Sequence, residues 1–209
     1  MPSGNWSGYV ETGGPFTEIT GTFSVTSLTY GGQTPAGDEM SEWVGIDGGN
    51  TGNKSLIQAG FNETPAPGTP TGFIIQPWWE ILPASETYIT SVHVQAGDHV
   101  TVEIYEMSGS SWNITLTDDT NGESFTTDQT YSGSDSTAEW IVEALSDPTV
   151  VPLAPYSPIV SFSDLGFIGP TASLEELVME QSGKQVSTPS SLTANGFNVA
   201  YGDAAPGSP

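Results

Sequence analysis

Apolar residues alternate with small polar residues in several short stretches of the chain. In residues 19–26, Ile19, Phe23 and Val25 are separated by threonine, serine and glycine. A period of two residues puts apolar side chains on one face of an extended segment and polar side chains on the other. The pattern therefore predicts half-buried β-strands. It recurs at 87–95, 100–105, 112–117, 159–162 and 196–201.

The segments between these predicted strands carry turn-forming residues. Asn121-Gly122 follows the strand at 112–117 and predicts a tight hairpin, because both residues tolerate a positive φ. Only residues 173–180 could form a helical turn, and they could equally open a strand. Many short strands with frequent turns are typical of an antiparallel sandwich. The sequence thus predicts an all-β fold, with a single domain over residues 1–201 and a C-terminal tail over 202–209.

The composition narrows the possible functions. The 209 residues include 25 acidic and 2 basic side chains, which gives a formal charge of −23 at pH 7, and no cysteine. Two lysines cannot form the cationic surface that nucleic-acid binding requires. Without cysteine the fold cannot be held by disulfides, and no stretch approaches the ~18 consecutive apolar residues of a membrane span. We therefore expect no nucleic-acid partner and no membrane partner.

The charge balance also predicts an acidic working pH. At neutral pH the acidic side chains repel one another and oppose compaction, whereas below their ordinary pKa of about 4 they become neutral. In strong acid the cations are then Lys54, Lys184, two histidines and the amino terminus, so the net charge stays small. We predict an acid-tolerant protein that loses stability as the pH rises through neutrality. A generic acidic surface is the alternative, but it explains the near absence of basic residues less well.

Four predicted strands combine polar side chains with large apolar ones. They lie within residues 41–48, 56–60, 78–83 and 138–144. Strand alternation places Glu80 on one face with Trp78, and Glu143 on one face with Glu139. Most of the 25 acids are expected on a solvated surface. A carboxyl group flanked by large apolar residues inside a strand is a stronger functional candidate, so Glu80 and Glu143 stand out.

Other catalytic chemistries lack the residues that they need. His93 and His99 have no third ligand at a spacing that suits zinc, so we predict no metal site and no cofactor. The Gly-x-Ser-x-Gly elbow of many serine hydrolases is absent, as are the Asp-Thr-Gly and Asp-Ser-Gly segments of an aspartic peptidase. No phosphate-binding glycine loop occurs either.

Several segments, in their order along the chain, are similar to those of the glutamic peptidases (eqolisins), a family of acid-active secreted endopeptidases. The similarity covers nearly the whole chain, and the Trp-Val-Gly-Ile-Asp-Gly and Gln-x-Gly-Phe segments are its most specific parts. It implies two packed, strongly bent antiparallel sheets of the concanavalin-like kind, with a substrate cleft on the concave face. The matching segments are Asn5 to Val10, Trp43 to Gly48, Ile57 to Phe61, Trp78 to Glu80, Ala138 to Glu143 and Val151 to Ala154.

The resemblance also implies a catalytic pair. The family's catalytic glutamine corresponds to Gln58 and its catalytic glutamate to Glu143. Such a pair can hydrolyse a peptide bond with one water molecule, because the glutamate carries the proton and the amide stabilises the oxyanion. An ordinary glutamate pKa of about 4.3 would suit acidic conditions. The further positions that line or support the cleft are Trp6, Trp43, Asp47, Trp78 and Glu80.

The sequence departs from the family pattern in two places. Ile81 and Leu82 stand where the family has aromatic residues, which predicts more aliphatic subsites. Fungal members often carry disulfides, so the lack of cysteine indicates a prokaryotic branch.

Two alternative functions stay open at this stage. One is a glycoside hydrolase that uses Glu80 and Glu143 as its carboxylate pair. The other is a lectin-like binding module without catalysis, which would use Trp43, Trp78 and Trp79. Only the peptidase requires the amide of Gln58.

The cellular setting follows from the resemblance. The sequence begins without a basic or apolar leader, so it is either an intracellular protein or a mature domain. The resemblance implies a secreted protein whose signal and propeptide lie outside this sequence. We expect a monomer that acts on polypeptides.

Overall fold

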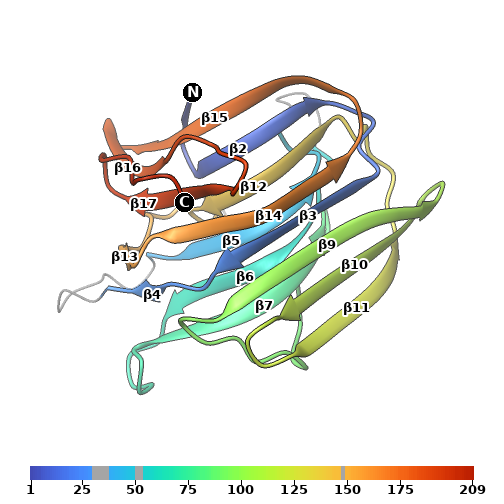
Figure 1. Cartoon of the computed structure of the whole chain (residues 1–209). Coiled ribbons are helices and arrows are strands. Elements are labelled where there is room, and N and C mark those ends of the chain that lie inside the picture. Colours follow the sequence, from blue (N-terminus) through green and yellow to red (C-terminus); the bar gives the residue numbers. More distant parts are fainter. Residues whose placement is uncertain (30–37, 50–53, 147–148) are drawn as a thin grey trace.

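The computed structural model describes residues 1–29, 38–49, 54–146 and 149–209. Within these ranges the chain forms β-strands joined by turns and loops, with no helix. The strands make two curved layers that lie one on the other (Figure 1). The all-β sandwich expected from the sequence is therefore confirmed.

The two layers are each built almost entirely from antiparallel neighbours. In hydrogen-bonded order, the first layer contains β11 (Glu123–Thr130), β10 (Ser111–Asp118), β9 (His99–Ser108), β3 (Glu18–Ser24), β14 (Val160–Ile168), β17 (Phe197–Tyr201) and β16 (Lys184–Pro189). The second layer contains β15 (Thr171–Gln181), β2 (Trp6–Gly13), β12 (Thr137–Glu143), β5 (Met40–Ile46), β6 (Ile57–Pro65), β7 (Phe73–Ile81) and β8 (Thr87–Tyr88).

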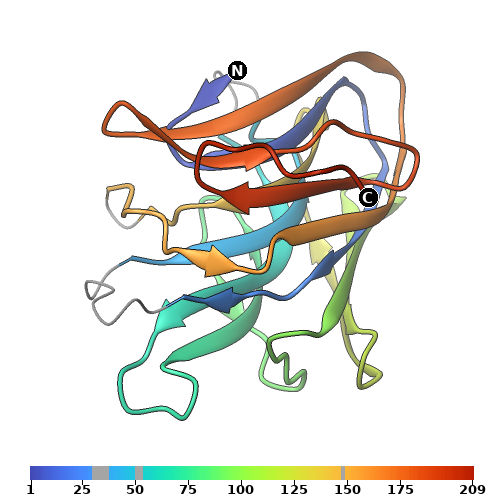
Figure 2. The same cartoon turned by 60° about the vertical axis from the view of Figure 1, so that its left-hand side comes forward.

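One long strand joins the layers. β15 pairs with β16 along one part of its length and with β2 along another. In Figure 2 this strand, in orange, curves across the top of the molecule. The short β1 (Pro2–Ser3) lies parallel to β15, and β4 (Ser27–Leu28) pairs with β13 (Tyr156–Ser157).

The main hydrophobic core fills the space between the layers. Phe23 of β3 contacts Phe61 of β6 from the opposite layer, with ring centroids 5.5 Å apart. Phe162 of β14 contacts Phe23 at 5.5 Å and stacks on Phe197 at 4.7 Å. Burying each such ring stabilises the fold by roughly 1.5–3 kcal/mol. The alternation in the sequence thus marks which side chains hold the two layers together.

The outcome differs for two of the predicted elements. Residues 173–180, left between a helical turn and a strand, belong to the strand β15. The strand predicted at 87–95 is only partly formed, because β8 ends at Tyr88. Val92 and Val94 nevertheless alternate with exposed residues and are buried, and Ile89 is buried as well. Their periodicity reports burial, whereas a β-strand also needs a neighbouring strand to pair with.

The C-terminal tail over residues 202–209 lies outside the named strands. It is hydrogen-bonded to the body of the protein through backbone carbonyl groups. The side-chain amide of Asn198 donates to the Gly207 carbonyl at 2.7 Å, and Thr188 Oγ1 donates to the Gly202 carbonyl at 2.7 Å. Among the described residues, no helix is suited to crossing a membrane.

Candidate active site

The candidate residues lie on one face of the second layer. β12 pairs with β5, and β5 with β6, so that Glu143 lies opposite Ser41 and Gln58 lies opposite Gly45. Ser41 and Gly45 are four residues apart on one strand and therefore point to the same side. Gln58 and Glu143 consequently share the face that turns away from the main core.

Glycines leave the space for the large side chains on this face. Trp43 lies opposite Gly60, where an added Cβ would come within 2.7 Å of the Trp43 Cβ and 2.0 Å of the Glu42 carbonyl oxygen. Gly45 lies opposite Gln58 in the same way, and a Cβ there would be 3.0 Å from the Gln58 Cβ. Glycine is thus favoured at these positions of the Trp-Val-Gly and Gln-x-Gly segments because a larger residue would crowd the neighbouring strand.

The carboxyl group of Glu143 is held by two neutral donors. Trp43 Nε1 donates to Glu143 Oε2 at 2.7 Å, and Asn5 Nδ2 donates to Oε1 at 2.9 Å. The Trp6 indole packs edge-on against Trp43, with centroids 5.0 Å apart, and lies beside the same carboxyl without a regular hydrogen bond. These aromatic rings remove water from one side of the carboxyl group.

This environment changes the acidity of Glu143. Burial raises its pKa to about 7, and the nearby N–H groups of Trp43, Trp6 and Asn5 counteract only part of that effect. The negative charge of Glu80 raises the pKa further. The structure therefore corrects the ordinary value assumed from the sequence. A group that titrates near neutrality can both accept and return a proton.

Gln58 is joined to Glu80 from the neighbouring strand. Its Nε2 donates to Glu80 Oε2 at 2.6 Å. The Gln58 side chain is buried, and its Oε1 has no hydrogen-bond partner among the described residues. Burial raises the pKa of Glu80, and the hydrogen bond from Gln58 partly offsets that increase. Glu80 is thus in direct contact with one candidate catalytic residue and electrostatically coupled to the other.

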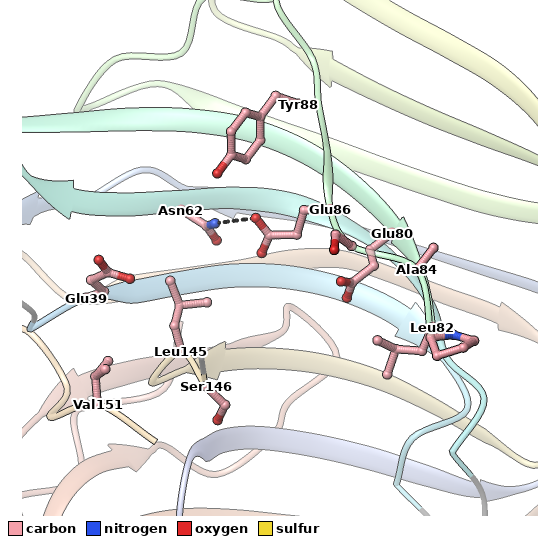
Figure 3. Close-up of a pocket in the computed structure, with 12 residues that line it drawn as sticks. Glu39, Asn62, Glu80, Leu82, Ala84, Glu86, Tyr88, Leu145, Ser146 and Val151 are labelled. Atoms are coloured by element: carbon pink, nitrogen blue, oxygen red, sulfur yellow. Dashed lines mark hydrogen bonds between the residues drawn. The ribbon is translucent and has the colours of Figure 1, made fainter. Parts of the chain in front are cut away.

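A cavity of about 630 Å³ adjoins this group. Figure 3 shows the carboxyl groups of Glu80 and Glu86 on one side of it and Leu145 across from them. Asn62 connects the cavity-lining Glu86 to the buried Trp78, because Trp78 Nε1 donates to its Oδ1 at 2.6 Å and its Nδ2 donates to Glu86 at 2.9 Å. The sequence patterns did not single out Asn62 or Glu86.

Two of the residues predicted to support the cleft, Trp43 and Trp78, are more deeply buried than the residues that line the cavity. Trp43 and Trp78 are almost inaccessible to solvent and form part of a second apolar cluster with Ile141. Glu139, on the same face as Glu143, is fully buried and accepts a hydrogen bond from the Gly49 backbone at 3.0 Å. Of the two glutamates of β12, only Glu143 is partly exposed.

Asp47 is fully buried and holds a neighbouring loop. Its carboxyl group accepts hydrogen bonds from the backbone N–H groups of Ser134, Asp135 and Ser136 and from the Tyr131 hydroxyl, at 2.6–2.9 Å. Burial opposes its ionisation, but the hydrogen bonds together outweigh burial and lower its pKa. Asp47 therefore supports the loop that follows β11 and does not face the cavity.

The two histidines lie away from this group. His93 is exposed and pairs with Glu123 through Nδ1 at 2.9 Å, and His99 is the first residue of β9. In the part of the chain that the structure describes, no three His, Cys, Asp or Glu side chains are grouped so that they could hold a metal ion.

Comparison with protein families identifies the chain. The model described as "Peptidase A4 family" matches residues 4–201. This protein belongs to the Peptidase A4 family. It is 30% identical to scytalidopepsin B from Scytalidium lignicola, over 85% of this chain and 69% of that protein. It is 28% identical to aspergillopepsin-2 from Aspergillus niger, over 95% of this chain and 78% of that protein.

Solved structures agree with this Peptidase A4 assignment at the level of the fold. The crystal structure of scytalido-glutamic peptidase with a transition state analog inhibitor aligns with a TM-score of 0.79 at 23% identity, covering 95% of this chain and 98% of the other. Aspergilloglutamic peptidase from Aspergillus niger aligns with a TM-score of 0.65 at 24% identity, covering 78% and 99%.

Membership of the Peptidase A4 family decides between the functions that the sequence left open. The protein is a glutamic endopeptidase, and the glycoside hydrolase and lectin interpretations are set aside. Asn5 belongs to the site through its hydrogen bond to Glu143, although no sequence pattern assigned it a role. The signal for it was its place immediately before Trp6 in a matching segment.

Proposed function

We propose that this Peptidase A4 protein is an acid-active, secreted endopeptidase in which Glu143 carries the proton and the Gln58 amide stabilises the oxyanion. The observation that supports this most directly is the shared face of the second layer. There Gln58 donates a hydrogen bond to Glu80, which lines the cavity, and the charge of Glu80 acts on the Glu143 carboxyl group.

In the proposed mechanism, ionised Glu143 accepts a proton from a water molecule as that water attacks the peptide carbonyl. The amide N–H of Gln58 that is not bonded to Glu80 donates to the developing oxyanion. Removing one such donor typically costs about 3 kcal/mol of transition-state stabilisation. Protonated Glu143 then returns the proton to the leaving nitrogen, and the peptide bond breaks. Gln58 stays neutral throughout, so its donor is present at every pH.

The proposed working range is weakly acidic. Because the pKa of Glu143 is raised to about 7, its ionised fraction increases as the pH rises from strong acid. A water molecule that donates a hydrogen bond to the carboxylate favours the charged form and extends the range downward. At the upper end, buried carboxyl groups elsewhere in the fold oppose ionisation and limit stability. An acidic extracellular medium is the setting that matches both limits and the charge of −23 at pH 7.

The proposal is tested by proteolysis of a denatured protein between about pH 3 and pH 8, a range that includes the raised pKa of Glu143, with and without pepstatin. We expect cleavage that pepstatin does not inhibit. Glu143→Gln and Gln58→Ala should each lower kcat/KM by about a hundredfold or more. Glu180→Gln is the matched control, because this glutamate is exposed on β15.

Two results would overturn the assignment of roles. Retention of proteolysis in both site variants would remove Glu143 and Gln58 from the mechanism. Hydrolysis of a glucan by the wild type, together with no cleavage of any polypeptide, would instead favour a carbohydrate substrate.

A further inference from the structure

Asn5 is anchored next to Glu143 by the backbone. β2 and β12 pair in a register that puts Trp6 opposite Glu143. The Ala144 backbone N–H then donates to the Asn5 carbonyl oxygen at 2.8 Å, which continues the ladder by one residue on each strand. The position of Asn5 is therefore defined by the same strand pair that carries the glutamate.

A small turn before β2 adds to this anchoring. Ser3 Oγ accepts hydrogen bonds from the backbone N–H groups of Trp6 at 3.1 Å and Asn5 at 3.5 Å. From this position Asn5 Nδ2 reaches Glu143 Oε1 at 2.9 Å. The amide thus meets the carboxyl group from the β2 side.

Trp43 meets the same carboxyl group from the other side. β12 lies between β2 and β5, and Trp43 of β5 donates to Glu143 Oε2 at 2.7 Å. Each carboxyl oxygen therefore has one donor, and each retains a further lone pair for water or a proton. Both donors are neutral, so they orient the carboxyl without the strong pKa depression that an adjacent cation would cause.

We propose that Asn5 is a positioning residue for the reaction, because its amide fixes the orientation of the Glu143 carboxyl and favours the ionised form. This inference rests on the proposed function, in which Glu143 carries the proton. It makes the segment before β2 part of the active site, although Asn5 acts through Glu143 and not on the substrate. The amide should affect turnover and its pH dependence more than substrate affinity.

The experiment compares Asn5→Ala and Asn5→Asp with the wild type. For Asn5→Ala we expect kcat to fall about tenfold or more, with KM changed by less than about threefold. The acid limb of the pH profile should move to higher pH, because the ionised carboxylate loses a donor. In Asn5→Asp the introduced carboxyl can donate only when protonated, so its activity relative to Asn5→Ala should be greatest in acid and decline as the pH rises.

Two controls separate this role from a structural one. Asn195→Ala removes an exposed amide far from the site in sequence and should keep the wild-type profile. Titration of the Glu143 carboxyl by NMR gives a readout that does not depend on activity, and its pKa should rise in Asn5→Ala. If Asn5→Ala does not fold, the isosteric Asn5→Asp variant tests the role of the amide in its place.

The possible failures are distinguishable. If Glu143→Gln remains active, the proposed function fails. If Glu143→Gln is inactive while both Asn5 variants keep the wild-type kcat and pH profile, only the role of Asn5 is overturned. An unchanged Glu143 titration in Asn5→Ala would equally overturn it.

Discussion

Gln58 donates its amide Nε2 to Glu80 Oε2 over 2.6 Å, and this bond defines which way the amide is turned. An ionised carboxylate only accepts hydrogen bonds, so the nitrogen must face Glu80. The Gln58 oxygen is directed elsewhere and has no partner among the described residues. Glu80 therefore acts on the reaction through the orientation of its neighbour.

Replacing Glu80 tests that relationship. In Glu80→Gln the new amide can accept or donate, so the orientation of Gln58 is no longer unique. We expect kcat to fall about tenfold. The negative charge of Glu80 raises the pKa of Glu143. Removing this charge should therefore lower that pKa and move the acid limb of the pH–rate profile to lower pH. Steady-state kinetics over pH measure both effects.

Glu86→Gln is the matched control for Glu80, because Glu86 lines the same cavity but is bonded to Asn62. It should change the acid limb less than Glu80→Gln. Equal shifts in the two variants would show that only the overall charge of the cavity matters.

The donor from Trp43 can be removed while an aromatic ring is kept. Trp43→Phe retains a ring beside Trp6 but loses the N–H that binds Glu143. We expect a rise in the pKa of Glu143 and a fall in kcat of about tenfold. Trp112→Phe makes the same chemical change in the first layer, where Trp112 packs against Tyr131, and should preserve the pH profile. An unchanged Glu143 titration in Trp43→Phe would contradict the role of this hydrogen bond.

Asp47 should contribute to stability in a pH-dependent way. Its pKa is lowered in the folded protein, so its contribution is present above the pKa of the unfolded chain and is lost as the pH falls through the folded value. In Asp47→Asn an N–H group would face the donors of Ser134 and Ser136. We expect the free energy of unfolding of Asp47→Asn to be about 3 kcal/mol below that of the wild type near pH 6, and this difference should become smaller in strong acid.

Unfolding by denaturant at several pH values measures the difference for Asp47→Asn. Asp203→Asn, at an exposed aspartate, is the control. A stability difference that is the same at every pH would mean that the charge of Asp47 is not what matters.

A second pair of carboxyl groups lies inside the main core. Glu42 of β5 and Glu63 of β6 are both fully buried. Thr26 Oγ1 donates to Glu63 Oε1 at 3.0 Å, whereas neither oxygen of Glu42 has a regular hydrogen bond to a described residue. The groups around the pair include the Leu28 backbone and the Tyr156 ring. No described cation offsets the charge of this pair, because the two lysines of the chain, Lys54 and Lys184, are both exposed.

This pair predicts that the protein loses stability as the pH rises. Burial raises the pKa of Glu63 to about 8 and raises that of Glu42 as well, with the Glu63 charge adding to the effect on Glu42. A carboxyl whose pKa is higher in the folded state binds more protons when folded. Its stability is therefore present below the unfolded pKa and lost as the pH rises through the folded pKa.

The melting temperature between about pH 4 and pH 8 tests this prediction, because the pair titrates across that range. We expect the melting temperature of the wild type to fall by roughly 10 °C or more over this range, which corresponds to a few kcal/mol of unfolding free energy. Glu42→Gln/Glu63→Gln should flatten the dependence, and Glu180→Gln should leave it as in the wild type. A double variant with the full wild-type decrease would assign the pH dependence to surface repulsion instead.

Local sequence patterns were enough to predict most of the strands and the faces on which their side chains lie. Alternation depends on neighbouring residues only, so it identified strands such as β3, β9 and β10 without knowledge of the fold. The resemblance to the glutamic peptidases, not the alternation, pointed to Gln58 and Glu143 as a pair. The alternation was misleading at 87–95, because hydrogen bonding to a neighbouring strand is not encoded in local periodicity.

Which of these side chains meet depends on the fold as a whole. Asn5 and Glu143 are 138 positions apart, and Trp43 and Glu143 are 100 positions apart, so their contacts depend on strand order and register. The same holds for Glu42 and Glu63, whose burial follows from the packing of one layer on the other. The pKa of Glu143 is decided at this level too, because burial and neighbouring donors exist only once distant strands have been brought together.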